Sequence, residues 1–349
     1  MTPVTLASLA DLASMPVDTI IDVRAPGEYA QDHIPGSINL PVLDDAQRAE
    51  VGTLYKQVSR FDARKRGGAL VARNTAAHLL GPLADKGGGW QPLVYCWRGG
   101  QRSGAFATIL DQVGWRVRLL GGGYRSYRRL VTAMLYDDPL EGLDLVLVSG
   151  GTGTGKTALL HALAAQGAQV LDIEGLAEHR GSLFGQTDTG QPPQKMFESR
   201  LAARIGGFDR SRTVFAEAES SKVGERALPP SLWAAMAAAP RIRVTAPIAA
   251  RTRFLCEAYG DLTRDVAALR ALLDRLRPYH GGQQVEAWKA DAAAGNWPAL
   301  AEGLIVRHYD ARYERTAEAR AETAGRLDLP DLGEATLAGA ARDLVARFT

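Results

Sequence analysis

The first residue whose chemistry stands out is Cys96, which follows a short apolar run. Residues 92–95 are typical of a buried strand, and a helical pattern begins at about residues 102–103. Gly99 and Gly100 allow the intervening loop to curve tightly, because glycine reaches backbone angles that other residues resist. The loop amides can then surround the sulfur and hold an anion that is bonded to it or approaches it. We therefore predict a reactive cysteine at the end of a strand.

Arg98 and Arg102 belong to the same loop. Together with the amides at the helix N-terminus, they would stabilise a thiolate, which is the reactive form of cysteine. The alternative is that Cys96 is a small buried hydrophobic residue, but a core position needs neither these arginines nor the neighbouring glycines. Cys256 stands in a helical pattern without such neighbours, so we expect it to be part of a helical core.

A glycine-rich segment in the second half of the chain matches the pattern G-x-x-x-x-G-K-[ST] of phosphate-binding loops without a mismatch. It consists of Gly150, Gly151, Thr152, Gly153, Thr154, Gly155, Lys156 and Thr157. An apolar strand pattern at residues 143–148 precedes it, and a helical pattern at residues 157–166 follows it, as such a loop requires. We predict that the loop amides bind a diphosphate, that Lys156 contacts its outer oxygens and that Thr157 holds Mg²⁺.

Nucleotide hydrolysis would need a further acidic site, usually an aspartate at the end of an apolar strand. The candidate segment, residues 212–221, offers Glu217 and Glu219 instead. Alternate residues of an extended segment lie on the same face, so both carboxylates could point at the phosphate loop. The alternative is a pair of solvated carboxylates at a strand end. The sequence thus supports phosphate binding better than ATP hydrolysis.

Two stretches of the first half carry a local excess of positive charge. Residues 116–129 contain five arginines and no acidic residue, and residues 56–73 contain six basic residues against Asp62 alone. Tyr124 and Tyr127 alternate with arginines and could stack on unpaired bases. The candidate nucleic-acid contacts are Arg64, Lys65, Arg66, Arg125, Arg128 and Arg129. The alternative is that both stretches are ordinary solvated helix faces.

These residues require elements that place strand ends beside helix starts. Residues 19–23 are a further predicted buried strand, and a polar stretch with proline and glycine at residues 136–142 marks a boundary near residue 140. From residue 249 onward the pattern is mostly helical. We therefore predict an α/β fold of two parallel-sheet domains, residues 1–138 and residues 139–349, the second with a helical C-terminal part.

The composition agrees with a globular protein of two domains. The chain has 349 residues, of which 46% are hydrophobic and 23% are charged, and its formal net charge is +2. It has no apolar run of about 18 residues and no signal-peptide pattern at its start, so we expect no membrane span. Its two cysteines lack a C-x-x-C spacing, so we expect no disulfide framework and a cytoplasmic location.

Three separated motifs of the first half resemble the rhodanese family of sulfurtransferases. They are DVRAPGEY at residues 22–29, HIPGSINLP at residues 33–41 and the cysteine loop. The resemblance covers residues 1 to about 135 and implies a rhodanese-like fold with a persulfide-carrying cysteine at position 96. In that family the first two motifs are mainly structural. The Cys-x5-Arg spacing from Cys96 to Arg102 equals that of cysteine-dependent phosphatases, so phosphatase chemistry stays open as an alternative.

The whole chain resembles the tRNA 2-selenouridine synthase family through YCWRGGQRS at residues 95–103, the phosphate loop and HRGSLFG at residues 179–185. The resemblance implies an enzyme that modifies the wobble uridine of tRNAs for lysine, glutamate and glutamine. It would convert 2-thiouridine to S-geranyl-2-thiouridine with geranyl diphosphate, and then to 2-selenouridine with selenophosphate. Cys96 would carry selenium, the loop at residues 150–157 would serve geranyl transfer, and a selenophosphate-supplying enzyme would be a partner.

The chemistry of the residues agrees with what this resemblance implies. An allylic diphosphate needs its leaving group stabilised as the C–O bond breaks, and Lys156, the loop amides and Mg²⁺ at Thr157 would supply that stabilisation. Glu217 or Glu219 would contribute to the metal or position the thiouridine.

Three alternatives belong to other classes of protein. A rhodanese-type sulfurtransferase would use a persulfide on Cys96 together with an ATP-dependent P-loop domain. A phosphatase would hydrolyse phosphate esters through the same cysteine. A non-catalytic module would bind tRNA with a steep salt dependence and would tolerate the loss of Cys96.

Overall fold

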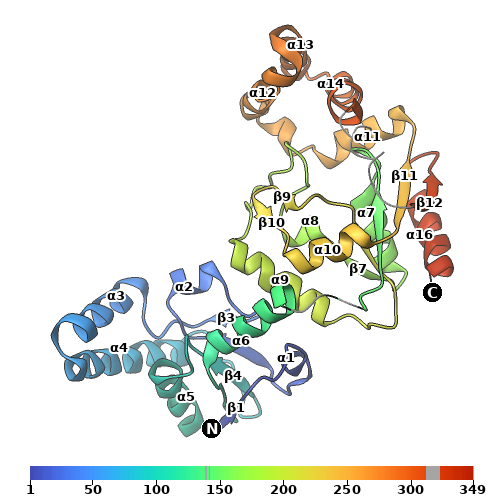
Figure 1. Ribbon diagram of the computed structural model, residues 1–349. Coiled ribbons are helices and arrows are strands. Elements are labelled where there is room, and N and C mark those ends of the chain that lie inside the picture. Colours follow the sequence, from blue (N-terminus) through green and yellow to red (C-terminus); the bar gives the residue numbers. More distant parts are fainter. Residues whose placement is uncertain (138–139, 141, 312–322, 349) are drawn as a thin grey trace. The chain divides into compact units, whose positions relative to one another are not determined.

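The computed structural model describes residues 1–137, 140, 142–311 and 323–348. They form two compact units, which Figure 1 shows as ribbons. The first unit comprises Met1–Pro139 with Pro192–Gly207, and the second comprises Leu140–Gln191 with Phe208–Thr349. The sequence predicted two uninterrupted domains, whereas the chain returns to the first unit for one later segment. None of the described helices has the length and apolar character needed to cross a membrane.

The first unit is built on a parallel sheet with the strand order β1-β5-β4-β2-β3. Its strands are β1 (Thr2–Val4), β2 (Thr19–Asp22), β3 (Ile38–Asn39), β4 (Pro92–Tyr95) and β5 (Arg118–Leu120). Every residue of β4 is buried, as expected for a central strand of a parallel sheet. This strand delivers Cys96 to the carboxyl edge of the sheet, where α/β proteins form their ligand sites.

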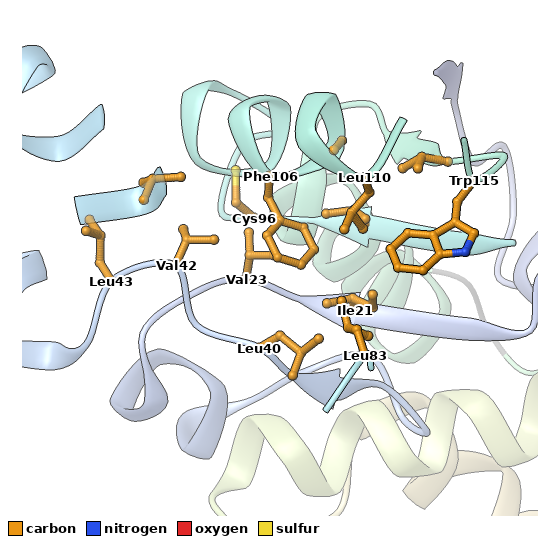
Figure 2. Packing of buried hydrophobic residues seen from close by; sticks show 14 of the residues in the cluster. Ile21, Val23, Leu40, Val42, Leu43, Leu83, Cys96, Phe106, Leu110 and Trp115 are labelled. Atoms are coloured by element: carbon orange, nitrogen blue, oxygen red, sulfur yellow. The ribbon is translucent and has the colours of Figure 1, made fainter. Parts of the chain in front are cut away.

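Helices supply the rest of the core of the first unit. They are α1 (Ala10–Ser14), α2 (Pro26–Gln31), α3 (Asp45–Thr53), η1 (Leu54–Val58), α4 (Arg60–Leu80), α5 (Gln101–Val113), α6 (Gly123–Thr132), η2 (Ala133–Asp137) and α9 (Gln194–Gly206). Apolar residues of α4 and α5 share one cluster with β2 and β4. Figure 2 shows Cys96 beside Phe106 in this cluster, so the thiol belongs to the edge of the hydrophobic core.

Helix α9 is the segment by which the chain returns to the first unit. Its buried residues include the charged Glu198. The Glu198 side chain is only 5% exposed, and it lies beside Arg128. A buried carboxylate needs partners, and Glu198 accepts hydrogen bonds from Arg128 and from Tyr136 (2.7 Å). These contacts hold α9 against α6 and η2.

The second unit has a parallel sheet with the strand order β12-β11-β6-β8-β7. Its strands are β6 (Leu145–Ser149), β7 (Gln169–Leu171), β8 (Val214–Glu217), β11 (Arg241–Thr245) and β12 (Thr323–Asp328), and a short antiparallel pair consists of β9 (Lys222–Val223) and β10 (Arg226–Ala227). The central strand β6 is buried along its whole length and leads into Gly150.

The helices of the second unit fall into two groups. They are α7 (Lys156–Ala165), α8 (Ile173–Leu176), α10 (Pro230–Ala238), α11 (Ile248–Ala258), η3 (Leu262–Arg264), α12 (Val266–Asp274), α13 (Arg277–Ala293), α14 (Trp297–Leu304), η4 (Ile305–Asp310) and α16 (Glu334–Phe348). Helices α7 and α16 pack with the sheet, while α12, α13 and α14 enclose a separate apolar cluster around Trp288. The predicted helical C-terminal part is therefore interrupted, because β12 returns to the edge of the sheet beside β11.

A buried ion pair beside β4 gives a test of this fold. Arg24 Nη2 lies 2.6 Å from Asp22 Oδ2, and both side chains are almost fully buried. Arg24→Ala leaves the charge of Asp22 buried without its partner, so we expect the free energy of unfolding to fall by about 3–5 kcal/mol in urea denaturation. Arg48→Ala, which removes an exposed arginine 3.8 Å from Glu28, is the control and should cost less than about 1 kcal/mol. Equal losses in the two variants would contradict the role of the buried pair.

Candidate active sites

The first site surrounds the sulfur of Cys96, which is 3% exposed. Its Sγ accepts hydrogen bonds from the Gly100 amide at 3.3 Å and from the Ser103 hydroxyl at 3.0 Å. The loop curves tightly because Gly99 has a φ of +65° and a Cβ there would lie 2.6 Å from Leu120 O. Donors that converge on one sulfur stabilise negative charge on it, so the loop can hold an anionic sulfur or a group bonded to it.

The arginines of this loop lie differently from the prediction. Arg102 makes an ion pair with Glu28, with a shortest distance of 2.6 Å, and Arg98 is exposed to solvent. Among the described residues, the hydrogen-bond partners of Cys96 Sγ are an amide and a hydroxyl, not a guanidinium. Arg102 therefore ties the first turn of α5 to α2. Sequence reasoning missed Ser103, although a serine at the start of the helix after a reactive cysteine is a signal for this role.

Two tyrosines expected to stack on bases are buried, so that expectation is wrong for them. Tyr124 is 4% exposed and Tyr127 is 2% exposed, because α6 turns this face toward the core. The hydroxyl of Tyr124 donates to Asp32 at 2.6 Å, and the Arg24 guanidinium lies 4.1 Å from the centre of the Tyr124 ring. Trp97 stacks on Tyr124 at 5.2 Å between ring centres and keeps 37% exposure, so it is the aromatic surface that the cysteine loop offers.

The basic residues divide into exposed and structural ones. On α4, Arg64 and Lys65 are exposed, and Arg66 is exposed but lies 2.8 Å from Glu50. On α6, Arg125 and Arg129 are exposed. Arg128 instead donates to Glu198 and to Lys195 O (3.0 Å), so its guanidinium holds α9 rather than facing solvent. The local sequence does not predict that Arg128 is structural while Arg125 and Arg129 are exposed, because its partner Glu198 is far away along the chain.

The second site is the phosphate loop, which runs from Gly150 to Thr157 between β6 and α7. Together with residues of α8, α11 and the segment at 180–182, most of this loop lines a cavity of about 430 Å³. Lys156 Nζ donates to Gly150 O at 3.1 Å, which places its ammonium group at the cavity. Loop amides, a lysine and a helix N-terminus in one cavity suit a diphosphate.

Arg251 holds the backbone of the phosphate loop in place at Thr152. Its Nε and Nη2 donate to Thr152 O at 3.0 and 2.7 Å, and its guanidinium pairs with Asp310 at 2.7 Å. Arg251 is only 7% exposed, and these partners occupy most of its donors. This arginine therefore positions the loop. No local pattern predicts this role, because α11 and η4 meet the loop only in the folded chain.

The carboxylates at the cavity are Glu174 and Glu219, not the predicted pair. Glu217 is fully buried, and its Oε2 accepts a hydrogen bond from the Ile173 amide at 3.0 Å. The expected shared face does not exist, because β8 ends at Glu217 and the Glu219 amide turns back to donate to Glu217 O at 2.9 Å. Glu174 was missed, although it lies in the first turn of α8, the helix that follows β7 directly.

Burial, together with repulsion from Glu219, raises the pKa of Glu174 to about 8. Thr157 Oγ1 donates to Glu174 Oε2 at 3.1 Å, so a hydroxyl and two carboxylates meet beside the loop. Such hard oxygen donors fit Mg²⁺, which would relieve the repulsion between the carboxylates. No group of three or more ligating His, Cys, Asp or Glu side chains occurs in the described part of the chain, so an ion here would also need oxygens of a bound diphosphate.

Arg180 is a further cation at this cavity that sequence reasoning did not select. It makes an ion pair with Asp261 at 2.9 Å, and its guanidinium lies 4.8 Å from the centre of the Tyr259 ring. Its Nη1 is shielded from solvent and has no hydrogen-bond partner among the described residues. Because a buried N–H group costs free energy when it is unpaired, this group is suited to donate to an oxygen of a bound anion.

Both sites lie in regions that match known families. Residues 5–130 match the profile of the rhodanese-like domain, and residues 143–278 match that of the tRNA 2-selenouridine synthase AAA domain. A tRNA 2-selenouridine synthase of Psychromonas ingrahamii is 37% identical over 244 residues, which cover 70% of this chain and 65% of that protein. Another, from Cronobacter sakazakii, is 36% identical over 327 residues, or 88% of this chain and 82% of that protein. A solved rhodanese-like domain protein from Staphylococcus aureus shares 19% identity with a TM-score of 0.23, covering 36% of this chain and 91% of that one.

The fold and the two sites define a protein that joins a rhodanese-like domain, with its loop cysteine, to a P-loop domain. The chain spans 65% and 63% of the lengths of its relatives from Psychromonas ingrahamii and Nitrosomonas europaea. Over the longer alignment with the Cronobacter sakazakii protein, the similarity extends through both units. The chain belongs to the tRNA 2-selenouridine synthase family, and both this resemblance and the α/β fold predicted from the sequence are confirmed.

The hydrogen bond from Ser103 to the sulfur gives a test of the first site. A hydrogen bond from a hydroxyl stabilises a thiolate, so Ser103→Ala should slow alkylation of Cys96 by iodoacetamide at neutral pH by about threefold. Thr108→Ala is the matched control, because it removes an exposed hydroxyl of the same helix that bonds Gly104 O. Unchanged alkylation of the Ser103→Ala protein would show that this hydroxyl does not stabilise the thiolate.

The raised pKa of Glu174 predicts a pH-dependent stability. The folded state keeps a proton on this carboxyl up to about pH 8, whereas the ordinary value is 4.5, so stability falls as the pH rises between these values. Glu174→Gln cannot ionise, and its melting temperature relative to the wild type should therefore increase between about pH 5 and pH 8.5. Glu225→Gln, at an exposed position, should show no such trend. If Glu174→Gln differs from the wild type by a constant amount at all pH values, another group is responsible.

Proposed function

We propose that this protein converts 2-thiouridine at the wobble position of tRNA to 2-selenouridine through S-geranyl-2-thiouridine. The co-substrates are geranyl diphosphate and selenophosphate, and the tRNAs are those for lysine, glutamate and glutamine. The observation that carries the proposal is the presence, in a member of this family, of a cradled cysteine and a separate diphosphate loop. Because its substrate is tRNA, the protein would act in the cytoplasm, with a selenophosphate-supplying enzyme as its donor partner.

Geranyl transfer belongs to the phosphate loop in this proposal. The sulfur of thiouridine forms a bond to the allylic carbon, the C–O bond breaks, and its electron pair leaves with the diphosphate while N3 of the base loses its proton. Lys156, the loop amides and Arg180 stabilise the charge that develops on the leaving group. Mg²⁺ held by Thr157, Glu174 and Glu219 would supply further charge neutralisation.

Selenium transfer belongs to Cys96 in this proposal. The selenium of selenophosphate forms a bond to C2, and the electron pair of the breaking C–S bond leaves with geranylthiolate. Water then takes the phosphoryl group as the P–Se bond breaks, so that 2-selenouridine and inorganic phosphate remain. In this step Cys96 holds the selenium donor beside the base, and its amide and hydroxyl neighbours stabilise the negative charge of that donor. In this proposal the exposed ring of Trp97 would stack on the target base.

The rivals fit the sites less well. A cysteine-dependent phosphatase needs its loop arginine on the phosphate, but Arg102 is paired with Glu28. A persulfide sulfurtransferase with an ATP-dependent P-loop domain remains the second candidate, since the phosphate loop alone accepts either kind of diphosphate.

Mass spectrometry of tRNA nucleosides tests the proposal. We expect geranyl diphosphate alone to give S-geranyl-2-thiouridine, and the further addition of selenophosphate to give 2-selenouridine. Lys156→Ala should lower geranylation at least about a hundredfold by removing a charge from the leaving group, whereas Cys96→Ser should keep geranylation and lose only selenium transfer. No mass change with any donor would contradict the proposal, and thiosulfate:cyanide sulfurtransferase activity with steady ATP turnover would favour the second candidate.

A further inference from the structure

An apolar cavity of about 80 Å³ adjoins the diphosphate cavity in the second unit. Thr152, Leu255 and Tyr259 line both cavities, so the two are separated only by these shared side chains. The rest of the apolar cavity is lined mainly by Phe184, Leu269, Trp297, Leu300, Ala301 and Leu304. None of the described residues that line it is charged.

The phosphate loop itself forms part of the wall between the cavities. Arg251 holds Thr152 through its carbonyl oxygen, and Gly153 packs so closely on α11 that a Cβ there would lie 2.9 Å from Leu255 Cγ. The segment at residues 180–184 spans both sides, because Arg180 lines the diphosphate cavity and Phe184 lines the apolar one. A rigid wall with one polar and one apolar face suits a ligand with a charged head and a hydrocarbon tail.

We infer that the apolar cavity holds the hydrocarbon chain of the allylic diphosphate whose diphosphate group lies in the phosphate loop. This inference rests on the proposed function and assigns a binding site for the chain to α11, α12 and α14. A nucleotide would place a ribose and a base next to its phosphates, and these groups need polar partners that this cavity does not supply. A hydrocarbon chain needs only to leave water.

The size of the cavity favours a short chain. A buried water molecule takes up about 10–15 Å³ of a cavity of this kind, so a volume of 80 Å³ has room for roughly five to eight groups of the size of water. The outer part of a ten-carbon chain fills such a space, with the carbons next to the diphosphate lying at the shared wall. A fifteen-carbon chain would have to displace Leu300 or Trp297.

Ala301→Phe fills the cavity and tests the inference in the full-length protein. We expect its Kd for geranyl diphosphate to rise at least about tenfold, which corresponds to losing the burial of roughly two methylene groups. Its Kd for inorganic diphosphate should not change, because the phosphate loop is untouched. Ala299→Phe adds the same side chain at an exposed position of α14 and should change neither Kd.

The opposite change provides an independent test if Ala301→Phe does not fold. Leu300→Ala enlarges the cavity, so its preference should shift from geranyl diphosphate toward farnesyl diphosphate relative to the wild type. The inference is overturned if Ala301→Phe binds geranyl diphosphate like the wild type, or if the wild type binds it no more tightly than inorganic diphosphate. Tight binding that Ala301→Phe weakens, without any geranylated tRNA, would contradict the proposed function and leave the chain-binding site standing.

Discussion

Both candidate sites depend on one constraint. In each loop that follows a central parallel strand, the backbone amides must point toward one common space, where a ligand can lie. Strand β4 ends at Tyr95 and β6 at Ser149, and each is a central, fully buried strand that fixes the start of its loop. Each loop then enters a helix, α5 or α7, whose free N-terminal amides face the same space. The capacity to bind an anion at Cys96 and at the phosphate loop therefore follows from the two sheets before any charged side chain is added.

Charged side chains mostly hold these loops in place. Arg24 pairs with Asp22 below the cysteine loop, Arg102 ties α5 to Glu28, and Arg251 fixes the carbonyl of Thr152. A guanidinium that makes several charge-assisted hydrogen bonds is held in one orientation, and it restrains the neighbouring backbone. The donors that remain to meet an anion include the loop amides and Ser103 at the first site, and Lys156 with Arg180 at the second.

The second site combines opposing electrostatic demands. Lys156, Arg180 and the loop amides attract an anion, whereas Glu174 and Glu219 repel it unless one carboxyl is protonated or a cation lies between them. The raised pKa of Glu174 is the cost of this arrangement in the folded protein. In the proposed function a magnesium diphosphate would satisfy both sets of groups at once, and the apolar cavity beside Thr152 would take the hydrocarbon chain of that diphosphate.

The sequence by itself determined the positions of Cys96 and of residues 150–157, the family and the α/β class. These depend on local patterns, namely apolar strands, glycines and helix starts that follow one another along the chain. Only the tertiary structure decided which charged residues meet the sites. Glu174 faces the phosphate loop because β7 and β8 lie side by side, Arg128 is occupied because α9 returns to the first unit, and Glu217 is buried because its strand is internal. Contacts between residues far apart in sequence leave no local pattern, and burial reverses the role that a charge has on a surface.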